Sequence, residues 1–348
     1  MSTFHTSARE KMIGEANKDE ENDAPASTID NTLYSRQSAL PHMHNGTINP
    51  HPNPYDNNNI VAFTPDPRLN TDDALPPQYN TNTTILVLLI ASSLSMLIFT
   101  VIPVIVKFPY ITSWFASSAV YRFIDPLVTL PLNYFLLVNS EVFLHNVYGK
   151  KRFLGLSEKN FIALLFMMSA AIYVQFHGVH TASAMFKHPV EQFNDDHPEL
   201  VQQFPVLYDI YLWMEDIWEH KIAHYLYAFG GACMIACQLY AYRAQVHQRL
   251  TGGQTALWGL AVLIYALIVA GVAIEFPGGQ IVGLVYSALM AVVIGLYTYL
   301  SGGLFTRGRR LVLQTLLMAY ILAFVIVVIY TIAVGGFKNR KSAGLFVR

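Results

Sequence analysis

The most constraining feature of this 348-residue sequence is a succession of long, mostly apolar segments. A helix needs about 20 such residues to cross the hydrocarbon core of a bilayer, and seven segments reach that length. They are residues 85–106, 123–145, 161–184, 206–242, 255–275, 281–301 and 311–334. The fourth is too long for one crossing, so we expect residues 222–242 to cross and residues 206–221 to form a helical extension outside the hydrocarbon. The sequence therefore predicts an all-α fold, a polytopic membrane helix bundle with about seven transmembrane helices.

The composition agrees with a membrane protein and excludes two other classes. Hydrophobic residues make up 53% of the chain and charged residues 13%, whereas a typical soluble domain carries about 25% charged residues. Two cysteines are too few for a secreted disulfide scaffold. A net charge of −1 does not suit a basic nucleic-acid-binding protein, so we expect no nucleic acid partner.

Residues 1–84 differ from the rest, because they are rich in asparagine and proline, as in residues 49–54 and 57–59. Such a segment cannot bury enough apolar surface to offset its chain entropy, so we expect a disordered N-terminal tail. It has no charged-then-apolar stretch typical of a cleavable signal peptide, and the first span is expected to act as the signal. The predicted organisation is this tail, a transmembrane domain over 85–334 and a short basic tail over 335–348.

Lysines and arginines in short loops set the orientation, because they favour the cytosolic side. The loops after the second, fourth and sixth segments all carry them and must share one side. The residues are Lys150, Lys151, Arg152, Lys159, Arg243, Arg249, Arg307, Arg309 and Arg310. The N-terminus is then cytosolic, the acidic loop 185–205 is lumenal, and the glycosylation sequons at Asn45 and Asn82 are unused. The basic C-terminus conflicts with this orientation, but three loops outweigh one terminus.

Ionisable side chains in membrane segments are costly and usually functional, and here they gather near one end of several segments. His177 and His180 are three residues apart and share a helix face. Along the fourth segment, at about 100° per residue, one half of the helix circumference carries six ionisable residues, and Lys221 is the exception. The six are Asp209, Glu215, Asp216, Glu219, His220 and His224. We therefore expect a polar cluster on the lumenal side. Its members are Asp125, His177, His180, Glu215, Asp216, Glu219, His220, His224, Glu275 and Gln280.

Three roles fit this cluster: a structural network that locks helices together, a site for a ligand or partner, and an active site. The last is an alternative because imidazole and carboxylate bind zinc and similar divalent metals and transfer protons. The candidate metal ligands are His177, His180, His220 and His224, and the candidate catalytic carboxylates are Glu215, Asp216, Glu219 and Glu275. A metalloprotease is excluded, because Lys221 follows His220 where that motif has glutamate.

Small residues in the fourth segment predict close helix packing. Gly230 and Gly231 permit close approach of a neighbouring helix. Cys233 and Cys237 lie four residues apart on one helix, a spacing that seldom meets disulfide geometry, so we interpret them as packing residues.

Several short motifs resemble the ceroid-lipofuscinosis neuronal protein 6 family. The stretch from Ala170 to His177, followed by His188, is similar to the end of the corresponding helix in that family. The stretch from Tyr211 to His220 resembles its acidic pair followed by histidine. Glu275 with Gly279-Gln280-Ile281 resembles its Glu-Gly-Gln-Ile turn, with two residues inserted. The resemblance covers roughly residues 110–334 and matches family polar residues at His177, Glu215, Asp216, His220, Glu275 and Gln280.

The resemblance implies a seven-span endoplasmic-reticulum protein with a cytosolic N-terminus, which self-associates and supports export of lysosomal or vacuolar enzymes. Our first hypothesis is therefore a non-enzymatic trafficking factor or receptor, whose partners are membrane lipid and lumenal cargo or a membrane partner. One rival is a metal-dependent intramembrane enzyme acting on a lipid or terpenoid. A lesser rival is a proton or metal-ion transporter, which is disfavoured because the cluster lies at one face and not at the midplane between repeated halves.

Overall fold

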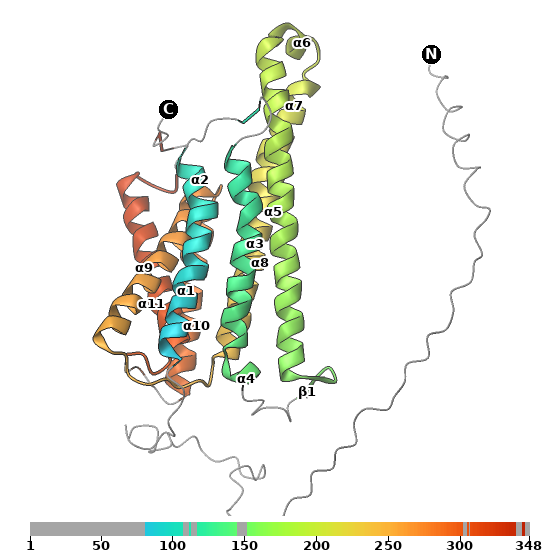
Figure 1. Cartoon of the computed structure of the whole chain (residues 1–348). Coiled ribbons are helices and arrows are strands. Elements are labelled where there is room, and N and C mark those ends of the chain that lie inside the picture. The colour runs from blue at the N-terminus through green and yellow to red at the C-terminus, as the bar shows by residue number, and fades with distance from the viewer. Residues whose placement is uncertain are drawn as a thin grey trace, which may run out of the picture. The chain divides into compact units, whose positions relative to one another are not determined.

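A computed structural model of the chain describes residues 81–106, 111–112, 117–144, 152–301, 305, 307–338 and 343–344. Residues 1–80 of the predicted disordered tail lie outside the described residues, whereas residues 82–84, predicted to be disordered, are helical. Of the predicted C-terminal tail, the structure describes residues 335–338 and 343–344. The described residues are mainly helical, as predicted, and the long helices run side by side in a bundle (Figure 1).

The first half of the bundle begins with α1 (Asn82–Met96), which continues through a π-helical turn, η2 (Leu97–Val101), into α2 (Ile102–Ile105). The next helices are α3 (Ser117–Val138) and α4 (Glu141–Leu144). A two-residue hairpin follows, in which β1 (Arg152–Phe153) pairs antiparallel with β2 (Leu156–Ser157), Phe153 opposite Leu156. The longest helix, α5 (Glu158–Asp196), starts directly after it, with the Ser157 side chain accepting a hydrogen bond from the Asn160 backbone amide.

The second half starts with two short helices, α6 (Pro198–Gln203) and α7 (Val206–Leu212). An 11-residue π-helix, η3 (Trp213–Ala223), joins α7 to α8 (His224–Ala241) without a break. Three further long helices complete the bundle: α9 (Gly252–Glu275), α10 (Gly279–Leu300) and α11 (Leu311–Ala333).

Six helical segments among the described residues are long and apolar enough to cross a membrane, which makes this chain an integral membrane protein. They are Asn82–Val101, Glu158–Asp196, Val206–Ala241, Gly252–Glu275, Gly279–Leu300 and Leu311–Ala333. The predicted count of seven is therefore not met. The missing span, 123–145, falls on α3 and α4, where Arg122, Asp125 and Asn133 reduce the apolar character of a 22-residue helix.

Two of the six segments are longer than a bilayer crossing needs. The 39 residues of α5 extend for about 58 Å at 1.5 Å per residue, nearly twice the hydrocarbon thickness of about 30 Å. The end of α5 projects past the other helices beside α6 and α7 (Figure 1). Residues 206–221 are helical, as predicted, and α7 at their start belongs to this projecting part (Figure 1).

Close packing of α5 against α8 depends on Gly230. A β-carbon at this position would lie 2.7 Å from the Tyr173 backbone nitrogen and 2.9 Å from the Ser169 carbonyl oxygen. Backbone atoms cannot move aside as a flexible side chain can, so only glycine fits. The prediction of close approach is confirmed at Gly230, and Cys233 and Cys237 are free thiols.

The end of the bundle nearest the hairpin is fastened by polar contacts. Arg243 places a guanidinium nitrogen 2.6 Å from Glu158 Oε1, and the Tyr240 hydroxyl donates to the same oxygen at 2.8 Å. Arg310 donates to the backbone carbonyls of Arg243 and Ser301. These basic residues therefore hold the connections between helices as well as carrying the charge that predicted their side of the membrane.

Candidate functional site

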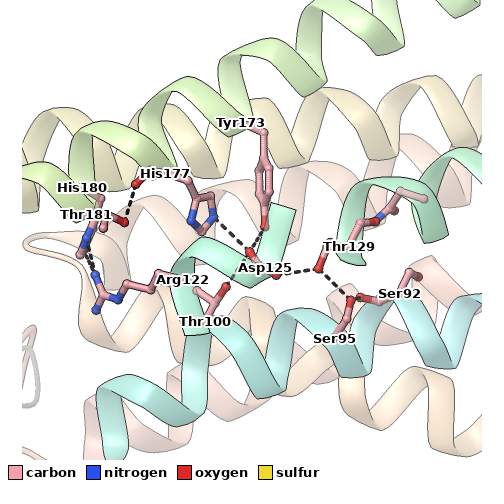
Figure 2. Close-up of polar contacts among 11 residues, drawn as sticks. Ser92, Ser95, Thr100, Arg122, Asp125, Thr129, Tyr173, His177, His180 and Thr181 are labelled. Atoms are coloured by element: carbon pink, nitrogen blue, oxygen red, sulfur yellow. Dashed lines mark hydrogen bonds and ion pairs between the residues drawn. The ribbon is translucent and has the colours of Figure 1, made fainter. Parts of the chain in front are cut away.

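The centre of the polar cluster is Asp125, which lies on α3 and is fully buried. Its Oδ1 accepts a hydrogen bond from Thr129 at 2.6 Å. Its Oδ2 accepts from the Tyr173 hydroxyl at 2.5 Å and from Thr100 at 3.1 Å, and His177 Nε2 lies 3.2 Å away (Figure 2). Four groups from three segments therefore surround one carboxylate inside the bundle.

Helical spacing explains why these side chains meet. Thr129 follows Asp125 by four residues, and His177 follows Tyr173 by four, so each pair lies on one face of its helix. The network continues into α1, where Ser95 Oγ and Thr129 Oγ1 lie 2.8 Å apart. The carboxylate thereby joins α1, α3 and α5.

A second group of side chains lies one helical turn along α5. His180 Nε2 lies 2.6 Å from His224 Nε2, and the two rings stack with centroids 4.6 Å apart. A hydrogen bond between two imidazoles needs one acceptor nitrogen, so at least one ring is neutral. The guanidinium of Arg122, on α3, contacts the ring of His180 (Figure 2).

A lysine from the projecting part of α5 pairs with the carboxylates of η3. Lys187 Nζ lies 2.6 Å from Glu219 Oε2 and 4.0 Å from Glu215 Oε1. The other oxygen of Glu219 lies 3.8 Å from His180 Nε2. Glu219 is 6% exposed, so this pair links the histidine group to the projecting helices.

The π-helix changes which residues face the cluster. Its hydrogen bonds join residues five apart, so each residue turns through less than the 100° assumed from the sequence. Glu219 and His224 are buried, whereas Asp216 is exposed and His220 is half-buried against the ring of His224, with centroids 5.4 Å apart. Sequence reasoning placed Asp216 in the cluster because it assumed an α-helix there.

A cavity of about 350 Å³ adjoins the histidines. Its charged and imidazole side chains come from four helices: Arg122 from α3, His177 and His180 from α5, His224 from α8 and Glu275 from α9. Glu275 ends α9 at the Phe276-Pro277-Gly278 turn, where Gly278 adopts φ 68°, a left-handed conformation that favours glycine.

Gln280 lies apart from this cavity lining. It is 3% exposed, accepts a hydrogen bond from Thr331 at 3.5 Å and donates to the Lys338 carbonyl. Gln280 therefore ties the start of α10 to the end of α11. The sequence could not give the direction of its side chain.

The four candidate metal ligands do not form one group. Among the residues that the structure describes, no set of three or more His, Cys, Asp or Glu side chains is arranged to hold a metal ion. His177 pairs with Asp125, while His180 and His224 pair with each other. Arg122 brings a permanent positive charge to His180, which opposes a divalent cation in the same place. The residues therefore do not fit the proposed zinc site.

Sequence reasoning missed three functional side chains, Arg122, Tyr173 and Lys187. Arg122 was left out because the predicted span began at residue 123, and Lys187 because the predicted third span ended at residue 184. Two signals were present in the sequence. Arg122 precedes Asp125 by three residues, and Tyr173 precedes His177 by four, so each shares a helix face with a residue of the cluster.

The fold and this site together define a class, a multi-pass helical membrane protein with a charged cavity inside its bundle. Comparison with protein-family models, with curated proteins and with solved structures gave no match.

Proposed function

We propose that this protein is a membrane receptor that binds the polar group of a ligand inside its helix bundle. The observation that carries the proposal is the cavity itself, where a guanidinium, three imidazoles and a carboxylate from four helices surround about 350 Å³ of space. A network that served only to lock helices together would be expected to close-pack around its paired groups, as protein interiors do. Charged groups at membrane depth that face a cavity are better explained by a ligand.

Binding is better supported than turnover. A catalytic acid or base must reach the substrate with its own proton or lone pair. In the cavity, His177 pairs with Asp125, and His180 is held between His224 and Arg122. The enzyme alternative rests on the His177–Asp125 pair, which resembles an acid–base pair, and it requires a measured turnover that Asp125→Asn abolishes.

The test uses purified protein and the compounds that remain bound to it. Mass spectrometry of the wild type should detect a retained compound that is depleted in Arg122→Gln and in Glu275→Gln. Asp216→Asn is the matched control, because Asp216 was predicted in the same cluster but is exposed. Equal retention in all variants, or no retained compound in the wild type, would overturn the proposal.

For the membrane topology, we propose that α3 is a seventh crossing. Its 22 residues extend for about 33 Å, and Asp125 is fully buried while Phe123 and Leu127 are 70% and 64% exposed. Polar groups that face a bundle while apolar groups face outward are typical of a membrane helix. With seven crossings and a cytosolic N-terminus, Asn45 should carry no glycan. If endoglycosidase treatment shifts the mobility of the protein on a gel and Asn45→Gln abolishes that shift, this topology is contradicted.

For the cellular role, we propose residence in the endoplasmic reticulum and support of lysosomal or vacuolar enzyme export. This rests on the sequence resemblance, and the projecting helices α5 to α7 offer a surface for cargo on the predicted lumenal side. Cells lacking the protein should deliver less hydrolase to the lysosome or vacuole, and a reporter-tagged protein should mark the endoplasmic reticulum. Normal hydrolase delivery would refute the role without affecting the binding proposal.

A further inference from the structure

A second cavity lies next to the charged one and is almost entirely apolar. Its volume is about 480 Å³, and its lining comes mainly from α8, α9 and α10. Ala232 and Ile235 line it from α8, Ile268 and Val269 from α9. Most of the hydroxyl groups in its lining are already bonded within the protein, such as those of Tyr173 and Tyr225, so the cavity offers few partners for ordered water and suits an apolar occupant.

The two cavities adjoin. Thr100, Tyr227, Val272 and Phe276 line both of them. The rings of Tyr227 and Phe276, which are in edge-to-face contact with centroids 5.8 Å apart, lie at the junction. A flexible hydrocarbon chain can pass such a junction more easily than a rigid fused-ring system.

The charges of the first cavity indicate what kind of polar group it takes. Arg122 supplies one positive charge and Glu275 one negative charge. A ligand with its own net charge would leave an uncompensated charge in a low-dielectric site, which is costly. A neutral group that both accepts and donates hydrogen bonds, such as a hydroxyl, can bond to the guanidinium and to the carboxylate in addition to the partners that they already have in the protein.

The size of the second cavity indicates the length of the apolar part. A cavity of about 150 Å³ holds one benzene ring, so about 480 Å³ has room for roughly eighteen carbon atoms. Its lining on α8 runs from Tyr225 to Ile235, a rise of about 15 Å along the helix. A single acyl chain with one bend fits this volume and length.

We infer that the ligand is a neutral, single-chain lipid with a hydroxyl-bearing head. Its head lies between Arg122 and Glu275, and its chain passes Phe276 into the apolar cavity between α8, α9 and α10. This inference rests on the proposed binding function and adds the chemical class of the ligand.

The test is photo-crosslinking of the purified full-length protein in detergent. The probes are a clickable diazirine monoacylglycerol, the fatty acid of the same chain and a diazirine cholesterol. The monoacylglycerol should label peptides of α8, α9 or α10. The fatty acid should label about tenfold less, because its carboxylate adds an uncompensated charge. Cholesterol labelling at the same peptides, equal to that of the monoacylglycerol, would overturn the single-chain assignment.

Cavity-filling variants separate this inference from the proposed function. Ala232→Phe fills the apolar cavity and should abolish labelling, whereas Ala236→Phe, four residues along the same helix and exposed, should not change it. Ala228→Leu, also in the cavity lining, is a smaller second filling variant, and thermal melting checks that each variant folds. If folded filling variants keep full labelling, the inference fails. If a retained compound still depends on Arg122 and Glu275, the proposed function stands without it.

Discussion

Replacing Asp125 by alanine should destabilise the folded protein strongly, because several buried donors depend on its carboxylate. Tyr173 is fully buried and His177 is 4% exposed, and both lie against Oδ2 of Asp125. Thr129 loses less, because its hydroxyl still pairs with Ser95 at 2.8 Å. The hydroxyls of Tyr173 and Thr100 are therefore the two donors left without their acceptor, and His177 loses the carboxylate that lies 3.2 Å from its Nε2.

The size of the effect follows from these two donors. An orphaned buried donor costs about 1–3 kcal/mol in protein interiors, and hydrogen bonds in membrane helices average about 0.6 kcal/mol. Two such donors and the space left by the side chain give an expected loss of about 2–5 kcal/mol. Asp125→Asn keeps the volume and one acceptor oxygen, so it should lose about half as much.

Thermal melting of the purified protein in detergent measures this loss. Asp216→Ala is the control, because Asp216 is exposed and a surface substitution changes stability by less than about 0.5 kcal/mol. If Asp125→Ala melts at the wild-type temperature, or if the two alanine variants lose equal stability, the carboxylate is not the anchor of this network.

Three further predictions concern other parts of the bundle, and thermal melting measures all of them. Gly230→Ala should cost about 1–3 kcal/mol through backbone overlap, whereas Gly178→Ala, with open space around its β-carbon, should be neutral or gain up to about 1 kcal/mol. Burial lowers the pKa of His247 to about 4. Because the unfolded histidine takes up its proton near pH 6.5, the unfolded state binds more protons between these pH values. Stability should therefore fall as the pH drops from about 6.5 to about 4, by about 3 kcal/mol in total, and His247→Gln should flatten this dependence. Arg243→Gln should cost about 3–5 kcal/mol, because it removes the cation from buried Glu158, and the double variant with Glu158→Gln should recover part of this loss.

The sequence was most informative where apolar residues were continuous. The segment predicted at 281–301 is α10, Gly279–Leu300, and the segment at 311–334 is α11, Leu311–Ala333. An uninterrupted apolar run with glycine or charged residues at its ends predicts where a membrane helix begins and ends. In contrast, α3 mixes polar residues that face the bundle with apolar residues that face outward. The mean hydropathy of its most apolar stretch is therefore lower than that of the six segments above, although its outward face is apolar.

The site was harder to predict from the sequence, because it depends on how each helix is rotated about its own axis as well as on how far along the bundle each residue lies. Topology brought Asp125, the histidines and Glu275 to one end of the bundle. It could not show that His177 pairs with Asp125 while His180 pairs with His224. The π-helix, which no local pattern indicated, also turned Asp216 outward.

The polar cluster consists of two parts that should respond differently to mutation. Asp125, Thr129 and Tyr173 form an anchor in which both carboxylate oxygens of Asp125 already accept hydrogen bonds. Arg122 and Glu275 lie against the cavity, and His177 touches both parts. If this division is right, anchor variants lower the melting temperature whether or not a ligand is present. Cavity variants should change ligand retention while the empty protein melts normally, since a ligand stabilises only the state that binds it. Variants of His177 should show both effects, which makes this residue the test of whether the anchor positions the binding site.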